Sequence, residues 1–95
     1  MKIYGIPNCN TVKKTLDWFR LHEIDFEFHD FKKLGIDRLK LEEWSGHLGW
    51  EALLNKRGTT WKMLSPEIQN SIRSKDSAFK LMQEKVSVIK RPVIE

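Results

Sequence analysis

The chain contains a single cysteine, Cys9, and this scarcity limits its chemistry. One cysteine cannot form an internal disulfide, so the sequence excludes a secreted scaffold held together by disulfide bonds. No apolar run reaches the length of a signal peptide or a transmembrane helix. The N-terminal segment that begins with Met1–Gly5 turns polar within a few residues. We therefore expect a cytoplasmic protein, in a reducing compartment where a thiol persists.

The chain also has only a small net charge. The 95 residues include 17 Lys and Arg against 13 Asp and Glu, which gives a formal net charge of +4. The basic residues are spread along the chain beside acidic ones, as in Lys40–Glu43, whereas a nucleic-acid-binding protein would gather them on one face. We expect no direct binding to nucleic acid and no membrane association. The charge indicates a mild preference for anionic small molecules.

The patterns along the chain predict the order β-α-β, then a helical stretch, then β. Apolar residues make up 40% of the sequence, and four Trp and five Phe supply large surfaces that a small core can bury. The expected strands are 2–6, 24–31 and 86–89. The first expected helix begins after one of the N-cap candidates Asn8, Asn10 and Thr11 and ends near His22. Further helices are expected from Asp37, with Leu41, Trp44 and Leu48 facing inward, from Ser65, and from about Asp76 to Glu84. Trp18, Trp44, Trp50 and Trp61 are expected in the core rather than on a base-stacking platform.

This order predicts an α/β, thioredoxin-like fold. The first β-α-β unit is short enough to be a right-handed crossover between parallel strands. We expect a single domain over residues 1–95 with a helical insertion at about 37–85, followed by a C-terminal strand. Such a domain would lack the last strand and helix of a thioredoxin-like fold.

Cys9 follows the first predicted strand and lies in the first turn of the first predicted helix. Pro7 ends the strand, because proline cannot donate to a ladder. The helix N-terminus offers unpaired N–H groups and a partial positive charge, and Lys13 and Lys14 add positive field one turn later. All of these favour the thiolate, which is the nucleophilic form of cysteine. The alternative is a small buried residue that fills space, and the exposed junction between Pro7 and Asn10 favours the reactive thiol.

Other candidate residues give weaker signals on their own. Arg57 lies in a loop rich in Gly and Thr, where it is either an anion-binding guanidinium or a solvated arginine. Pro92 after Arg91 is a candidate for a cis peptide bond, although trans is commoner. The histidines and Cys9 lack metal-ligand spacing, so we expect no metal site, and His29 is expected on the surface.

Four segments together resemble the arsenate reductase (ArsC)/Spx/YffB family, in the same order and over essentially the whole chain. They are Tyr4–Lys14, Phe28–Phe31, Leu48–Trp61 and Ile89–Pro92. The match is closest to the YffB-like branch, whose pattern continues past Ile94 with a strand and a helix. The resemblance implies a thioredoxin fold with a helical insertion.

The resemblance also implies roles for individual residues. Cys9 would be the catalytic thiol, Arg57 and Arg91 align with the arginines that bind the oxyanion in arsenate reductases, and Pro92 aligns with the cis-proline beside the thiol. In that mechanism the thiolate attacks arsenate, glutathione resolves the adduct, and glutaredoxin recycles the enzyme. We expect the substrate-binding residues to be Arg57, Arg91, Pro92, Asn8 and Lys13.

Two departures from the family pattern narrow the functional hypothesis. In arsenate reductases the sequence that begins at the nucleophile resembles Cys-Gly-Thr-Ser-Arg. This chain has Cys9-Asn10-Thr11-Val12-Lys13 instead, and so lacks that Ser and Arg. Spx-type regulators usually carry Cys-x-x-Cys, and Val12 at the second position excludes an internal dithiol switch. The leading interpretation is a glutathione-dependent thiol oxidoreductase with one nucleophilic cysteine, glutathione as co-substrate and no bound cofactor. The alternatives are an arsenate reductase linked to glutathione and glutaredoxin, and a non-enzymatic Spx-type regulator that binds RNA polymerase.

Overall fold

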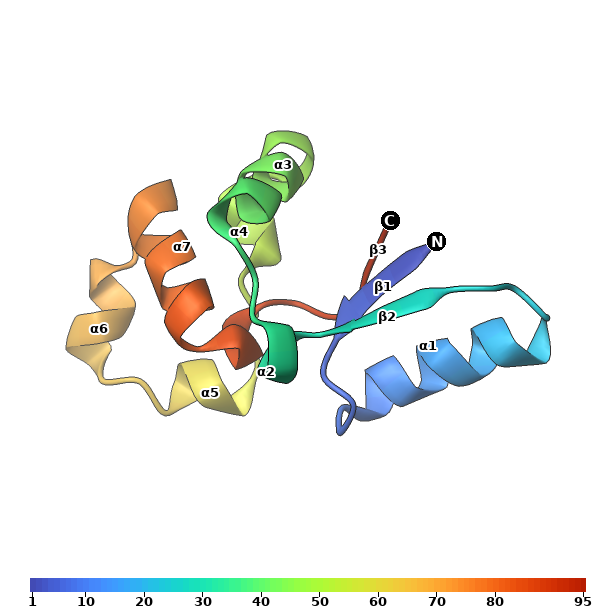
Figure 1. Cartoon of the computed structure of the whole chain (residues 1–95). Coiled ribbons are helices and arrows are strands. Elements are labelled where there is room, and N and C mark those ends of the chain that lie inside the picture. The colour runs from blue at the N-terminus through green and yellow to red at the C-terminus, as the bar shows by residue number, and fades with distance from the viewer. The chain divides into compact units, whose positions relative to one another are not determined.

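The computed structural model describes all 95 residues, Met1–Glu95, and the chain divides into two compact units (Figure 1). The first unit comprises Met1–Gly35 together with Arg91–Glu95, and the second comprises Ile36–Lys90. The predicted helical insertion at about 37–85 therefore falls entirely in the second unit. No helix has the length and apolar character that crossing a membrane requires.

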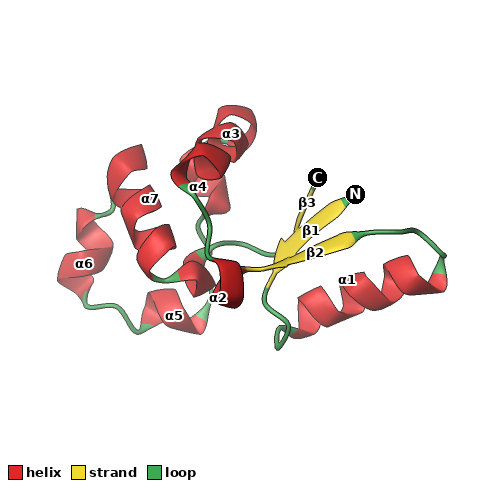
Figure 2. Cartoon of the chain, in the orientation of Figure 1, coloured by secondary structure: helices red, strands yellow, loops and turns green.

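The first unit contains a three-stranded sheet with the order β2-β1-β3 (Figure 2). Strand β1 (Lys2–Gly5) pairs in parallel with β2 (Glu27–Asp30) and antiparallel with β3 (Val93–Ile94). Helix α1 (Asn10–Leu21) connects the two parallel strands, and the one-turn helix α2 (Phe31–Leu34) follows β2. The predicted β-α-β crossover with parallel strands is confirmed, and the chain returns to the sheet at its C-terminal end.

The core of the first unit forms between α1 and β1. Val12, Leu16 and Phe19 recur at i, i+4 and i+7, as the sequence predicts, and pack against Ile3. Cys9 lies partly buried at the margin of this cluster. The helix can approach the strand because position 5 is glycine: a Cβ on Gly5 would lie 2.7 Å from Cγ2 of Val12.

The second unit is helical. It contains α3 (Arg38–Leu48), α4 (Trp50–Leu53), α5 (Thr59–Lys62), α6 (Pro66–Ser71), α7 (Lys75–Glu84) and the 3-10 helix η1 (Val86–Val88). Its buried apolar side chains are Leu41, Trp44, Leu53, Leu54, Trp61, Ala78, Phe79, Leu81, Met82, Val88 and Ile89. The predicted helix starts at Asp37 and Ser65 are confirmed, since each side chain accepts a hydrogen bond from the backbone N–H three residues later.

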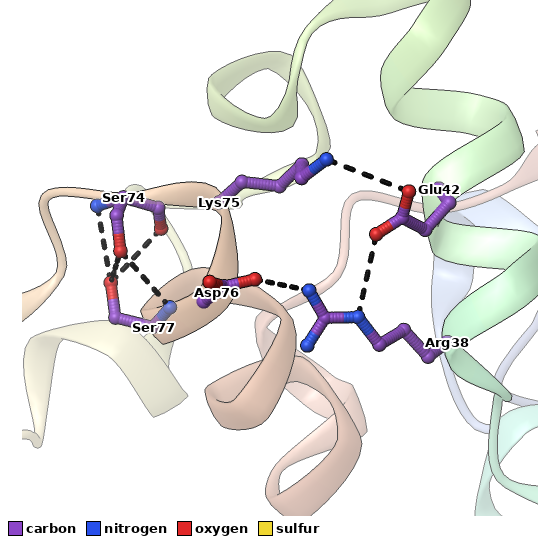
Figure 3. A network of polar contacts seen from close by, with 6 residues as sticks. All are labelled: Arg38, Glu42, Ser74, Lys75, Asp76 and Ser77. Atoms are coloured by element: carbon purple, nitrogen blue, oxygen red, sulfur yellow. Dashed lines mark hydrogen bonds and ion pairs between the residues drawn. The ribbon is translucent and has the colours of Figure 1, made fainter.

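An exposed polar network connects α3 with the start of α7 (Figure 3). Arg38 forms ion pairs with Asp76 and with Glu42, and Nζ of Lys75 lies 3.5 Å from Oε2 of the same Glu42. Beside it, the hydroxyl of Ser74 accepts a hydrogen bond from the Ser77 N–H, while the Ser77 hydroxyl accepts one from the Ser74 N–H. This reciprocal capping box starts α7 one residue before the predicted position.

Two of the predicted strands are wrong in extent or in kind. Residues 86–88 of the expected strand form the 3-10 helix η1, and only Ile89 keeps a strand-like contact, in an isolated antiparallel bridge with Leu54. The strand expected over 24–31 shortens to Glu27–Asp30, and it ends before Phe31 because the Asp30 carboxylate accepts a hydrogen bond from the Lys32 N–H and so caps α2. In both places a local hydrogen bond or turn overrides β propensity.

Three predictions of burial also need correction. Leu48, expected on the inner face of α3, is exposed because it is the last residue of the helix before the Gly49 C-cap. Trp18 is 51% exposed, because α1 turns it away from the Val12 row and stacks it on His22. His29 is part-buried rather than on the surface: its ring lies 4.8 Å from that of Tyr4, and Nε2 is 2.7 Å from a backbone oxygen.

Candidate functional site

Cys9 is the N-cap residue of α1, one position before the first helical turn in which the sequence placed it. The exposed Pro7 and Asn8 form the turn after β1, and the Cys9 N–H donates to the Ile6 carbonyl at 3.2 Å. Its own carbonyl accepts the first helical hydrogen bond, from the Lys13 N–H at 2.9 Å. The thiol therefore sits where a helix presents its unpaired N–H groups.

Several groups around Cys9 act on the charge of its thiol. Partial burial by itself raises the pKa of Cys9, whereas the backbone N–H of Val12, the Arg91 guanidinium and the backbone N–H of Thr11 lower it. The lowering contributions win, so the pKa of Cys9 lies below the ordinary thiol value. Val12 and Thr11 hold the N3 and N2 positions, whose N–H groups face an N-cap side chain. A larger thiolate fraction at neutral pH follows, and with it a stronger nucleophile.

Arg91 reaches the thiol from the far end of the chain. It immediately precedes β3, and the antiparallel pairing of β3 with β1 brings this segment to the end of β1 where α1 begins. The Arg91–Pro92 peptide bond is cis, which is the isomer that the family resemblance implies. The structure thus brings Cys9 and Arg91 together within the first unit.

The other predicted site residues fall into two groups. Asn8 and Lys13 are exposed on either side of Cys9, and the cation that acts on the thiol is Arg91 rather than Lys13. Arg57 belongs to the second unit, in the loop between α4 and α5, where its backbone N–H donates to the Asn55 side chain at 3.2 Å. There it lines a pocket of about 490 Å³.

Sequence reasoning missed part of that pocket. Glu51 and Lys90 line it together with Lys56 and Arg57, although Lys90 lies far from the other three in the sequence. The available signal was the position of Lys90 next to Arg91 in the last family segment. No group of three or more His, Cys, Asp or Glu side chains is placed to hold a metal ion.

Comparisons with known proteins show what this chain is similar to. The ArsC family matches residues 4–95. An uncharacterized protein of Haemophilus influenzae is 41% identical over 92 residues, which cover 97% of this chain and 80% of that protein. A solved structure of a YFFB protein is 39% identical, with a TM-score of 0.91 over 99% of this chain and 82% of its own.

A second solved structure is an arsenate reductase (ArsC) related protein from Brucella melitensis. It is 40% identical, with a TM-score of 0.78 over 99% of this chain and 78% of its own. The global transcriptional regulator Spx of Lactiplantibacillus plantarum is 24% identical over 94 residues, which cover 97% of this chain and 70% of that protein. These relatives confirm the predicted thioredoxin-like α/β fold class and the resemblance to the YffB-like branch.

Proposed function

This chain belongs to the ArsC family, and we propose that it is a glutathione-dependent thiol oxidoreductase whose only nucleophile is Cys9. One observation carries the proposal: Cys9 sits at the N-terminus of α1 beside Arg91, where its pKa lies below the ordinary thiol value. A chain with one cysteine has no internal resolving thiol, so an external thiol must complete the cycle. Glutathione is the proposed co-substrate, and no bound cofactor is required.

The proposed cycle has two exchange steps. In the first, the Cys9 thiolate attacks the glutathione sulfur of a mixed disulfide, and the substrate sulfur leaves as a thiolate that takes a proton from water. In the second, the thiolate of free glutathione attacks the glutathione sulfur now bound to Cys9. This step releases oxidised glutathione and restores the Cys9 thiolate. The substrate sulfur is reduced, and the free glutathione is oxidised.

Arg91 supports both steps of the proposed cycle. It favours the attacking thiolate in the first step, and in the second step it favours Cys9 as the leaving group, because a thiol of lower pKa leaves faster. Asn8, Lys13 and Pro92 are proposed to contact the substrate around the thiol, and Arg57 is proposed to bind an anionic group. The proposed compartment is the cytoplasm, where glutathione is available and glutaredoxin could act as a partner.

The test is a turnover assay with a glutathione mixed disulfide, free glutathione and coupled detection of oxidised glutathione. Wild-type protein should turn over, and Cys9→Ser should lose all turnover, because serine does not form the thiolate or the mixed disulfide. Circular dichroism would establish that the variant is folded. A folded Cys9→Ser protein with full activity would refute the proposal.

Arsenate reduction is a second candidate, favoured by the 40% identity to the ArsC-related protein of Brucella melitensis. In this reaction the Cys9 thiolate would attack arsenate, with Arg57 and Arg91 binding the oxyanion. It predicts arsenate-dependent oxidation of glutathione in the presence of glutaredoxin. If arsenate produces no oxidation while Cys9 remains reactive towards disulfides, this candidate is removed.

A third candidate is a non-enzymatic regulator, favoured by the match to the transcriptional regulator Spx. It predicts a complex with RNA polymerase that survives Cys9→Ser, because binding would not need the thiol. Immobilised chain incubated with purified polymerase provides the test. Retention of no polymerase subunit by either the wild-type or the Cys9→Ser protein would exclude this candidate.

A further inference from the structure

The strand that follows Arg91 is short and lies at the edge of the sheet. β3 contains only Val93 and Ile94, and β1 is its one neighbour in the order β2-β1-β3 (Figure 2). A short edge segment opens locally unless further contacts hold it. The contacts that hold β3 on β1 therefore also determine whether Arg91 stays beside the thiol.

Tyr4 contacts β3 at two points. Its backbone is the ladder partner of Val93, and its hydroxyl donates a hydrogen bond to Oε1 of Glu95 at 2.9 Å. Glu95 is the diagonal neighbour of Tyr4 across the two strands, a separation that aromatic and long side chains can span. The backbone closes the same end of the ladder, because the Lys2 N–H donates to the Glu95 backbone oxygen at 3.0 Å and the Glu95 N–H donates to the Lys2 carbonyl at 2.8 Å.

The Tyr4 ring is fixed before its hydroxyl binds anything on β3. The residue is 2% exposed, and its ring centroid lies 4.8 Å from that of His29 and 6.1 Å from that of Phe31. Nζ of Lys2 lies 5.4 Å from the centroid of the same ring. A side chain that is already immobilised loses little further entropy when its hydroxyl gains a partner. The acceptor is a carboxylate, which makes the hydrogen bond stronger than one between neutral groups.

The hydrogen bond between Tyr4 and Glu95 also selects one register of β3. A slip by one residue would move Glu95 to the opposite face of the sheet, away from the Tyr4 hydroxyl. The same slip would carry Arg91 about 3.3 Å along β1. A movement of that size is enough to break a hydrogen bond between a guanidinium and a thiolate.

We propose that Tyr4 and Glu95 are positioning residues for the thiol, because their hydrogen bond holds β3 in register and so keeps the Arg91 guanidinium beside Cys9. Neither side chain has to touch the substrate. The inference rests on the proposed role of Cys9 as the nucleophile, and it applies whichever substrate that nucleophile attacks. It gives a function to Tyr4, which is buried on the sheet rather than exposed around the thiol.

The test measures the rate at which iodoacetamide alkylates Cys9 in the full chain at pH 7, by intact mass against time. Tyr4→Phe removes the hydroxyl and keeps the ring, and Glu95→Ala removes the acceptor, so each should slow alkylation about two- to fivefold. Loss of the Glu95 charge by itself would favour the thiolate, so slowing in Glu95→Ala is not a direct charge effect. Glu95→Gln keeps an oxygen that accepts from the Tyr4 hydroxyl, and it should retain the wild-type rate.

The Arg91→Gln background separates positioning from a general loss of structure. If Tyr4 acts through Arg91, adding Tyr4→Phe to Arg91→Gln should neither slow alkylation further nor move the midpoint of thiolate formation. Ser74→Ala is the matched control, because it also removes a hydroxyl hydrogen bond, at the start of α7 in the second unit, without touching β3. Its alkylation rate should equal that of the wild type.

Three results would overturn the inference: an unchanged rate in Tyr4→Phe, equal slowing by Tyr4→Phe in the wild-type and Arg91→Gln backgrounds, or equal slowing in Ser74→Ala. Circular dichroism establishes that each variant is folded, and if Tyr4→Phe is not, Glu95→Ala in the two backgrounds gives the same comparison. Alkylation requires no glutathione. A chain that shows the loss through Arg91 but turns over no glutathione mixed disulfide therefore keeps this inference and loses the proposed function.

Discussion

The guanidinium of Arg91 lies beside the thiol of Cys9 and favours its deprotonated form, although the two residues are near opposite ends of the chain. Two features of the fold produce this relationship. The turn after β1 places Cys9 at the N-cap of α1, and the antiparallel β3 returns the segment around Arg91 to the same end of β1. A helix N-terminus and a guanidinium thus act on one thiol.

Replacing Arg91 should slow the reaction of the thiol. In Arg91→Gln the partial burial of Cys9 still raises its pKa, while one of the groups that lower it is gone. We expect alkylation by iodoacetamide at pH 7 to slow about three- to tenfold, measured by intact mass against time. Lys13→Gln is the control, because it removes an exposed cation from α1 and should leave the rate almost unchanged. Equal rates for wild type and Arg91→Gln would contradict the assignment.

The lowered pKa of Cys9 also predicts how stability depends on pH. Desolvation opposes the shift, and the contributions of Val12, Arg91 and Thr11 prevail, so the folded pKa is below the unfolded value. At pH values above the pKa of the thiol in the unfolded chain, such a group makes its full contribution to stability. The contribution is lost as the pH falls through the pKa of the thiol in the folded chain. The difference in unfolding free energy between wild type and Cys9→Ser should therefore increase as pH rises towards the ordinary thiol value of 9.0. Urea denaturation at a series of pH values measures it, and a difference that shrinks with rising pH would show the opposite shift.

Position 5 should tolerate only glycine. The Cβ of Gly5→Ala would lie 2.7 Å from Cγ2 of the buried Val12, so α1 or the strand must move. We expect a loss of about 1–3 kcal/mol in unfolding free energy, measured by urea denaturation. Because Val12→Ala removes the clashing methyl groups, the double variant should lose less than the sum of the two single losses. Strictly additive losses would mean that this contact is not the cause.

The capping box of α7 makes a separate prediction in the second unit. Ser74→Ala leaves the Ser77 N–H without its acceptor and should cost about 1 kcal/mol of stability. Ser74→Asp keeps an acceptor at the N-cap, next to the positive end of the helix, and should restore most of the loss. Thermal unfolding of the three proteins gives the comparison, and an Asp variant as unstable as the Ala variant would argue against capping.

Local patterns predicted the parts of the fold that local interactions determine. Asp37 and Ser65 start helices because their side chains accept hydrogen bonds from N–H groups three residues away, which a sequence reveals directly. The strand predicted over 86–89 was wrong because β-branched residues alone do not make a strand. Here the N–H groups of Val88 and Ile89 donate instead to carbonyls three residues earlier, which forms a 3-10 turn. Helix periodicity placed Val12 correctly on α1, whereas the stacking of Trp18 on His22 has no periodic signature.

The candidate site likewise has a local part that the sequence alone predicted and a long-range part that it did not. The strand-to-helix junction at Cys9 is a local feature, so the sequence alone predicted an activated thiol there. The partnership with Arg91 depends on the antiparallel return of β3, and only the family resemblance pointed to it before the structure. Lys90 joins the pocket of Arg57 through the bridge between Leu54 and Ile89, a long-range contact that no spacing rule in this sequence indicates.

The central claim is that folding turns Cys9 into an activated thiolate, and a titration of the thiolate tests it most directly. The ultraviolet absorbance of the thiolate is followed against pH in the folded chain and in the same chain unfolded in urea, with Cys9→Ser subtracted to remove the contribution of Tyr4. Since Cys9 is the only cysteine, the remaining signal belongs to it alone. The account predicts a midpoint in the folded chain below that of the unfolded chain. A folded midpoint equal to or above the unfolded one would contradict it and leave Cys9 a structural residue.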